Sequence, residues 1–448
     1  MFVMMRVRNQ EFVNSARFWN MTSALTRPAS AVETITGLLG LIGLMGATVA
    51  TRPLAETDPA MAVLVICAMT ALPMVLVDLL LHRVHRRESA GLRPLSWRDT
   101  IRMVDLGRSG MKLLGLAATV LALWLLYATL PEYQSSFYRP FYQAVGLVLP
   151  WLGLLAVPYV VLLDARMAEP RDGYWMAGAA VLGRWRDIDR ALLGQHVRGW
   201  LVKGFFLPLM FVYMSRQVQG MSDPGALRVT FMAVFDQLYQ WIFLIDLSFA
   251  LIGYILTVRL IDSHIRSTDP TWFGWTVGLI CYQPFWDGIS ARYFAYEDSL
   301  KWTGWLAPWP VLQTLWGCAI LALLLVYAWG TLAFGYRFSN LTHRGILTHG
   351  PFRWTKHPAY ITKNLSWWLI SVPFISQAGP AEALRHCALL AGVNLIYFLR
   401  ARSEERHLSA DPVYVAYALW INEHGLFRRL SRLVPALRYR PPGLATAA

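Results

Sequence analysis

Residues 59–81 read PAMAVLVICAMTALPMVLVDLLL and hold a single charged side chain, Asp78. About 20 mostly apolar residues let a helix cross the hydrocarbon core of a bilayer, so this stretch predicts a membrane-spanning helix. The whole chain of 448 residues agrees, because 56% are hydrophobic and 15% are charged, against about 45–50% and about 25% in soluble domains. The mean hydropathy is +0.40. We therefore predict an all-α, polytopic transmembrane helical bundle and exclude a disordered chain or a disulfide-rich secreted module.

Ten apolar stretches of the chain are candidates for membrane spans. One of them, 271–286, is interrupted by Gln283-Pro284, and aromatic residues surround this dipeptide. We interpret it as a broken or re-entrant segment, which could line the entrance for a lipid substrate or belong to an aromatic belt at the outer membrane surface. The predicted spans are 33–50, 59–81, 110–130, 141–163, 200–219, 229–257, 271–286, 306–334, 361–378 and 381–400.

The basic residues predict how the chain is oriented in the membrane. There are 41 Lys and Arg against 27 Asp and Glu, a net charge of +14. With a cytoplasmic N-terminus, 34 of the 41 lie on the cytoplasmic side of the predicted spans, which is what the positive-inside rule requires. We therefore expect both termini in the cytoplasm, and no nucleic-acid partner is needed to explain the charge. The excess of arginine, 36 of the 41, is typical of a GC-rich bacterial gene, so we expect a bacterial inner-membrane protein.

Small and acidic residues inside the predicted spans have separate explanations. Glycines at positions 37, 40, 43 and 46 share one helix face and predict close helix packing; no strand precedes them, which excludes a dinucleotide loop. Asp78 lies near the inner end of its span, where we expect a structural contact with His82 or Arg83. Asp246 lies near the middle of its span, where an ionisable group is a functional candidate. It could bind substrate or hydrogen-bond a neighbouring helix.

Reactive side chains concentrate in the last 110 residues. Segment 336–363, YRFSNLTHRGILTHGPFRWTKHPAYITK, holds five Lys or Arg, three His and no acid. Pro358 favours the first turn of a helix and would place His357 at its aqueous mouth. The predicted hairpin 361–378 and 381–400 then returns the chain to the same side at Glu404-Glu405. We therefore expect the basic loop and the two glutamates to be neighbours. The four cysteines show no metal-binding spacing, and no metal site is expected.

This pattern resembles the isoprenylcysteine carboxyl methyltransferase and phospholipid methyltransferase family of integral membrane proteins. The resemblance covers roughly residues 305–430, and it implies an S-adenosylmethionine-dependent methyltransferase with its cofactor at the cytoplasmic mouth and a lipophilic substrate that enters from the bilayer. The matching positions are His343, Gly350, Phe352, Arg353, His357, Pro358, Tyr360, Glu404, Glu405, Leu408, Tyr414 and Tyr417.

The resemblance also implies roles for individual residues. His357 and Arg353 would be catalytic, and Arg400 and His407 are weaker candidates for substrate binding. Asp246 is a further weak candidate for substrate binding, on the ground of its position in a span and not of the resemblance. The expected cofactor contacts are His357, Pro358, Tyr360, Glu404, Glu405 and Lys356.

Two local departures and one large addition distinguish the chain from the family pattern. Lys356 stands where the family usually has Arg, which keeps the charge but loses bidentate contact. Thr362-Lys363-Asn364 replaces a small, Gly-containing stretch. About five extra spans precede the family core. We thus divide the chain into a cytoplasmic segment 1–32, a transmembrane module 33–300 without an assigned role, and a methyltransferase-like domain 301–448.

Two other classes of function stay open from the sequence. The same motifs, with GYRFSN at 335–340, resemble more distantly the membrane sterol reductases, which would imply NADPH as cofactor. Paired carboxylates favour a sulfonium cofactor over a phosphate-rich one, because they attract the former and repel the latter. The third class is a transporter or a non-catalytic membrane scaffold.

Overall fold

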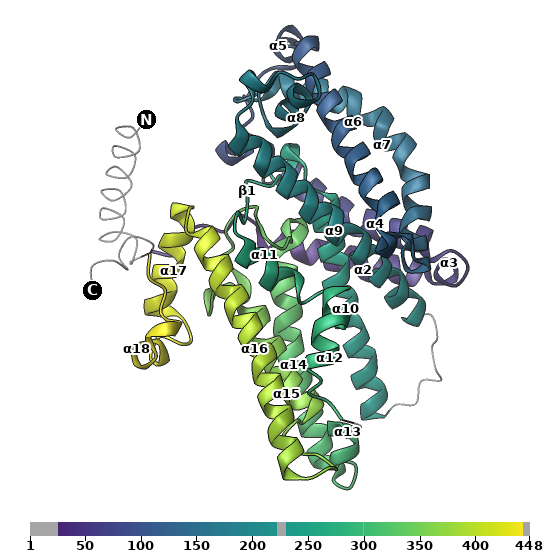
Figure 1. The fold of residues 1–448 in the computed structure, drawn as a ribbon, viewed down its shortest axis with the longest axis vertical. Coiled ribbons are helices and arrows are strands. Elements are labelled where there is room, and N and C mark those ends of the chain that lie inside the picture. The colour runs from purple at the N-terminus through teal and green to yellow at the C-terminus, as the bar shows by residue number, and fades with distance from the viewer. Residues whose placement is uncertain (1–25, 222–229, 299, 442–448) are drawn as a thin grey trace.

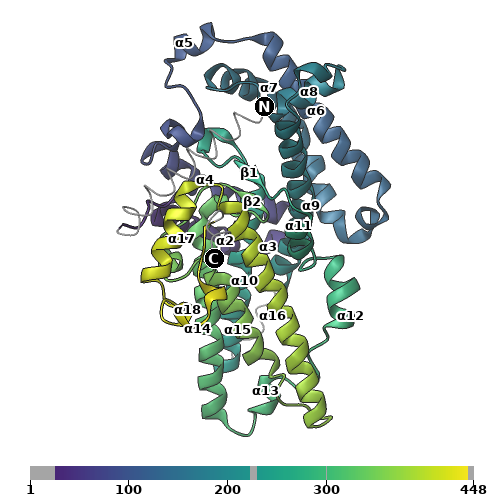
Figure 2. The ribbon, with the colours of Figure 1, turned by 60° about the vertical axis from the view of Figure 1, so that its left-hand side comes forward.

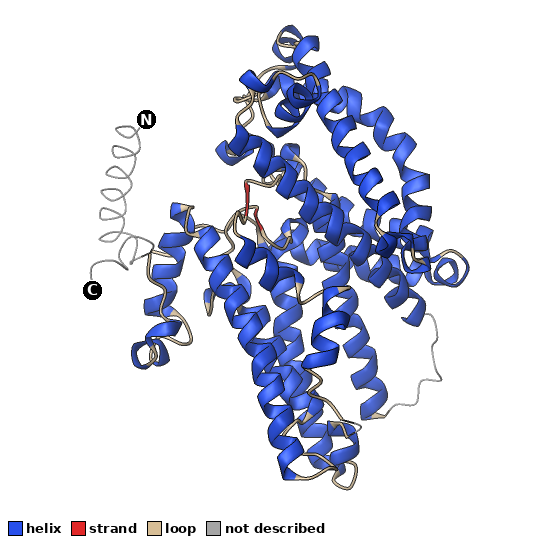
Figure 3. Ribbon diagram, in the orientation of Figure 1, coloured by secondary structure: helices blue, strands red, loops and turns tan. Residues whose placement is uncertain are grey.

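The computed structural model describes residues 26–221, 230–298 and 300–441. Within this part the chain is mostly helical and has almost no strand (Figure 1, Figure 3). Two strands of two residues each, β1 (Ser267–Thr268) and β2 (Thr342–His343), pair antiparallel with Ser267 opposite His343. The prediction of an all-α bundle is confirmed at this level, and most of the predicted segment 1–32 lies outside the described residues.

In the described part of the chain, seven helices are long and apolar enough to cross a membrane, namely α4, α6, α7, α9, α10, α14 and α16. In chain order the helices are α2 (Thr34–Ala50), α3 (Arg52–Thr57), α4 (Pro59–Leu80), α5 (Trp97–Arg102), α6 (Leu106–Thr129), α7 (Arg139–Arg166), α8 (Gly173–Val181), α9 (Arg190–Met221), α10 (Phe231–Ile255), α11 (Trp272–Leu279), α12 (Ala291–Tyr293), α13 (Trp302–Trp305), α14 (Pro310–Phe334), α15 (Pro358–Ser371), α16 (Pro380–Leu408), α17 (Pro412–His424) and α18 (Leu430–Leu433).

The remaining three predicted spans correspond to shorter helices. The first is the apolar α2, with 17 residues. In 271–286 only α11, with eight residues, is a regular α-helix, and in 361–378 the helix α15 has 14 residues. Helix α15 ends early because Val372, which precedes a proline, adopts a left-handed conformation, and a residue before proline is disfavoured in the helical region. The number of spans therefore stays a prediction.

Helix α2 packs through its glycine face, as the sequence predicted. A Cβ atom at Gly37 would lie 2.3 Å from the carbonyl oxygen of Leu332 in α14, and one at Gly43 would lie 2.5 Å from the carbonyl oxygen of Met69 in α4. No atom lies within 4 Å of the same point at Gly46. The close approach is thus limited to the part of α2 that faces its neighbours.

Asp78 in α4 ties the N-terminal helices to the segment that follows α14. Its carboxylate accepts a hydrogen bond from Thr36 of α2 at 2.7 Å and a second from the hydroxyl of Tyr336. All three residues are buried. Asp78 has the structural role that we expected, but its partners are Thr36 and Tyr336 in place of His82 or Arg83. The contact fixes the start of the basic loop against the membrane-length helices.

The helices near the basic loop form one bundle. Figure 2 shows α14, α15 and α16 running side by side on one side of the short sheet, with α17 beside the sheet. Helix α14 contacts both α10 and α15, and α15 contacts α16. The loop that joins α14 to α15 therefore lies over one end of this bundle.

Candidate active site

Backbone contacts fix the basic loop before any catalytic side chain is considered. The buried Arg344 guanidinium donates to the carbonyls of Gly253 and Leu256 at the end of α10, at 2.7 and 2.8 Å, and to Ser263 at 2.7 Å. The carbonyls of Gly253 and Leu256 lie at the end of a helix, which leaves them without helical partners. Pairing of β2 with β1 holds His343, the residue before Arg344, opposite Ser267. The loop is thus rigid where it meets the bundle.

Lys356 and His357 meet Glu405 across the hairpin of α15 and α16. The Glu405 carboxylate lies 2.5 Å from the Lys356 ammonium and 3.2 Å from Nε2 of His357. Arg402 adds a third contact at 2.7 Å. The Glu405 and Lys356 side chains are 7% and 9% exposed, so they form a buried ion pair. The expectation that the basic loop and the glutamates are neighbours is confirmed.

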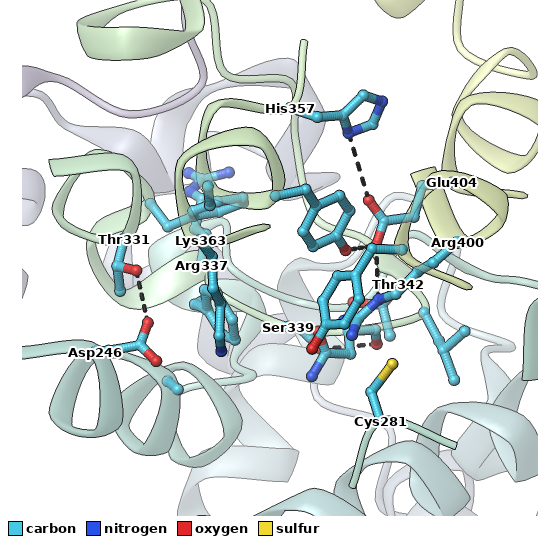
Figure 4. A pocket seen from close by; sticks show the side chains of 18 of the residues that line it. Asp246, Cys281, Thr331, Arg337, Ser339, Thr342, His357, Lys363, Arg400 and Glu404 are labelled. Atoms are coloured by element: carbon cyan, nitrogen blue, oxygen red, sulfur yellow. Dashed lines mark hydrogen bonds and ion pairs between the residues drawn. The ribbon is translucent and has the colours of Figure 1, made fainter. Parts of the chain in front are cut away.

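Glu404 points into a different environment from that of Glu405. It accepts a hydrogen bond from the hydroxyl of Tyr360, lies 3.5 Å from Nε of Arg400 and 3.9 Å from Nδ1 of His357. Figure 4 shows His357 and Arg400 converging on the carboxylate of Glu404. Its side chain is 29% exposed. Glu404 is therefore the one of the two glutamates that can also contact a bound molecule.

These side chains line a cavity of about 680 Å³, within the range of about 300–1,000 Å³ that is common for small-molecule sites. Two of the sequence-predicted site residues do not line it. Arg353 is exposed, with its guanidinium 4.9 Å from the ring centre of Trp354, and Glu405 lies behind Lys356 and His357. The predicted residues that do line the cavity are His357, Pro358, Tyr360, Lys356, Glu404, Arg400, His407 and Asp246.

The polar end of the cavity lies beside the short sheet. His343 is 3.2 Å from the carboxylate of Asp411, and His407 is 2.9 Å from the hydroxyl of Ser267. Burial opposes ionisation of Asp411, but the contact with His343, the backbone N–H of Val413 and the charge of Arg266 together outweigh it and lower the pKa of Asp411. Burial also lowers the pKa of Lys356, and the nearby Glu405 offsets part of this effect. The polar end therefore holds the imidazoles of His343 and His407, and its charged groups Asp411 and Lys356 already have partners.

The other end of the cavity reaches into the membrane-length helices. Asp246 of α10 accepts hydrogen bonds from the hydroxyls of Tyr327 and Thr331 in α14, the latter at 2.7 Å. Asp246 thus both joins two helices and lines the cavity, so the two explanations offered from the sequence are not exclusive. The segment of 271–286 also reaches the cavity, through Cys281 and Tyr282.

Sequence reasoning missed two polar residues of the site. Asn340 accepts a hydrogen bond from Arg400 and donates to the hydroxyls of Tyr254 and Tyr282, at 2.9 and 3.1 Å. It lies within GYRFSN, which had been considered only as a whole. Lys363 lines the cavity as well, and the sequence marked it only as a departure from the family pattern.

Among the described residues, no group of three or more His, Cys, Asp or Glu side chains could hold a metal ion. Comparison of the chain with models of protein families, with curated proteins and with solved structures gives no match in any of the three. The function of the site must therefore be inferred from its geometry and chemistry.

Proposed function

We propose that this chain is an integral membrane methyltransferase that moves a methyl group from S-adenosylmethionine to a lipophilic acceptor. One observation carries the proposal. The basic loop and the two glutamates, which together carry the family-like motif, meet at the polar end of a cavity that continues between membrane-length helices. A polar cofactor and an apolar acceptor could therefore share one cavity, each at the end that suits it.

The cavity side chains fit the cofactor that the motif implies. S-adenosylmethionine supplies a methyl group on a positively charged sulfur. Glu404 is a partly exposed carboxylate in the cavity wall and would stabilise that charge. The hydroxyl of Tyr414, beside the polar end, is buried without a hydrogen-bond partner in the described part of the chain. Because buried polar groups rarely stay unpaired, this hydroxyl suits a ligand.

The remaining residues of the site would position groups and handle protons. Tyr360 and Arg400 both contact Oε1 of Glu404, and Glu405 fixes the ring of His357 through Nε2. An acceptor hydroxyl or amine must lose a proton, and His357 would take it. A carboxylate acceptor has no proton to lose, and His357 would then serve only to orient the reactants.

Membrane topology completes the proposal. We infer ten spans, with both termini and the polar end of the cavity in the cytoplasm of a bacterial inner membrane. The excess of Lys and Arg on one side of the predicted spans supports this orientation. The lipid bilayer itself would be the reservoir of the acceptor.

Binding of the two candidate cofactors tests the proposal directly. Purified protein in detergent is titrated with S-adenosylmethionine and, separately, with NADPH by isothermal titration calorimetry. We expect saturable binding of S-adenosylmethionine. Its dissociation constant should rise about tenfold or more in His357→Ala and in Glu404→Gln. Incubation of a membrane lipid extract with methyl-labelled cofactor should then reveal the labelled acceptor.

Matched substitutions in α17 control for unspecific effects. His424 hydrogen-bonds to the carbonyl of Trp420 in its own helix, and Glu423 pairs on the surface with Arg438; neither lines the cavity. His424→Ala and Glu423→Gln should therefore bind S-adenosylmethionine as the unsubstituted protein does. Tight binding of NADPH without binding of S-adenosylmethionine would refute the proposal in favour of a reductase. Binding of neither would favour a transporter or scaffold.

A further inference from the structure

Lys363 brings a positive charge into the part of the cavity that lies between membrane-length helices. It stands in the second turn of α15, and its ammonium lies 5.2 Å from the ring centre of Tyr327 and 5.7 Å from that of Trp367. Figure 4 shows Lys363 between Asp246 on one side and Glu404 with Arg400 on the other. All of these residues line the cavity. Lys363 thus sits between the polar end and the membrane-depth end.

Of the other cations in the cavity wall, four already have strong partners, and the fifth, Arg216, lies 4.5 Å from the ring centre of Phe137. Lys356 pairs with Glu405, Arg337 with Asp262 at 3.2 Å, and Arg400 with Glu404. Arg344 is saturated by backbone carbonyls. These four are therefore not available to pair fully with a ligand.

Lys363 differs from them because it has only aromatic partners. Within the described residues its ammonium forms neither an ion pair nor a hydrogen bond, and the two ring contacts are its close interactions. Asp246, an acid that lines the same cavity, is held by the hydroxyls of Tyr327 and Thr331. An ammonium has three N–H donors, and those of Lys363 remain open to a molecule in the cavity.

We propose that Lys363 binds the acidic group, a carboxylate or a phosphate ester, of an amphiphile that enters the cavity from the bilayer. An ionisable side chain at membrane depth is costly and usually serves a function. A charge-assisted hydrogen bond to an anionic oxygen would use the open donors. The tail would lie along apolar lining residues such as Phe243, Leu247 and Trp286.

Lys363 is not one of the positions that carry the family resemblance. Lys363 belongs to Thr362-Lys363-Asn364, which departs from the small, Gly-containing stretch of the family that the chain resembles. The inference goes beyond the proposed function, because it concerns the binding of an acidic amphiphile and does not depend on S-adenosylmethionine. Asp246 limits the strength of the site, since a fixed negative charge close to Lys363 repels an anion.

Competition between an acid and the matching alcohol tests the site. The protein is placed in nanodiscs of zwitterionic lipid, without S-adenosylmethionine, and a bound fluorescent fatty acid is displaced by palmitate, hexadecyl phosphate or hexadecanol. We expect at least one of the two acids to bind about tenfold more tightly than the alcohol, which corresponds to about 1.4 kcal/mol. The acid that binds better identifies the group as carboxylate or phosphate.

Four substitutions sharpen the test. Lys363→Met should remove the preference for the acid over the alcohol, whereas Lys363→Arg should keep it. Asp246→Asn should increase the affinity for the acid severalfold. Lys301→Met is the matched control, because Lys301 is 55% exposed and paired with Glu297. This substitution should leave the affinities for the acids and for the alcohol unchanged.

Equal binding of acids and alcohol by the unsubstituted protein would overturn the inference, and so would a preference for the acid that persists in Lys363→Met. The comparison on the unsubstituted protein and the effect of Asp246→Asn do not depend on the folding of Lys363→Met, which a thermal melt checks. The competition assay contains no S-adenosylmethionine. Its result therefore tests binding at Lys363 independently of whether the protein is a methyltransferase.

Discussion

At the scale of single residues, the site separates its two glutamates by burial. Glu405 is buried and neutralises Lys356, whereas Glu404 is partly exposed and faces the cavity. Removing one partner of a buried ion pair leaves an uncompensated charge. The two neighbouring glutamates should therefore respond differently to the same substitution, Glu405 through stability and Glu404 through binding.

Glu405→Gln tests the structural half of this division. We expect it to lower the free energy of unfolding by on the order of 3 kcal/mol, because the Lys356 ammonium then stays buried without a counter-charge. The double variant Lys356→Met with Glu405→Gln should lose less than the sum of the two single variants, a coupling that denaturant or thermal unfolding measures.

The surface residue Glu423 provides the control for that cycle. Its carboxylate lies 2.6 Å from Arg438, but both side chains are 39% exposed, and exposed pairs contribute about 0–1 kcal/mol. Glu423→Gln should therefore unfold almost as the unsubstituted protein does. If Glu405→Gln is no less stable than Glu423→Gln, the buried pair has no structural role.

At the scale of elements, hydrophobic length predicted the long helices well. The ends of short helices depend on local backbone chemistry, and α15 shows both outcomes. Pro358 does begin this helix, as expected of a proline in a first turn, but the left-handed Val372 ends it seven residues before the predicted limit of 378. Hydropathy does not report such a conformation, since Val is apolar in either state.

The glycine face of α2 gives a prediction at this scale. Gly37→Ala would place a methyl group 2.3 Å from the Leu332 carbonyl oxygen, so α2 and α14 must separate. Overpacking of this kind costs about 1–3 kcal/mol, which a thermal melt in detergent would register. Gly46→Ala meets nothing within 4 Å and should be neutral or slightly stabilising, because Ala favours a helix over Gly by about 1 kcal/mol. Equal melting temperatures of the two variants would contradict this packing.

At the scale of the whole molecule, the candidate site was only partly predictable. The meeting of Lys356 and His357 with Glu405 followed from a hairpin that returns the chain to its starting side. The contributions of Asn340, Lys363 and Asp411 depend on how separate helices pack, which spacing along the chain does not encode. The cavity also takes one wall from α9 and α10, which belong to the module 33–300 that the sequence left without a role.

This shared wall predicts that the family-like domain does not bind ligands alone. Met210 and Tyr213 of α9 and Phe243 and Asp246 of α10 line the same cavity as Glu404. Residues 301–448 produced alone should therefore show no saturable binding of S-adenosylmethionine or of palmitate. Residues 1–300 and 301–448 produced together as two chains should copurify and recover both, because the buried contacts between α10 and α14 do not require the connecting segment. Binding of either ligand by residues 301–448 alone would show that the first module is dispensable for the site.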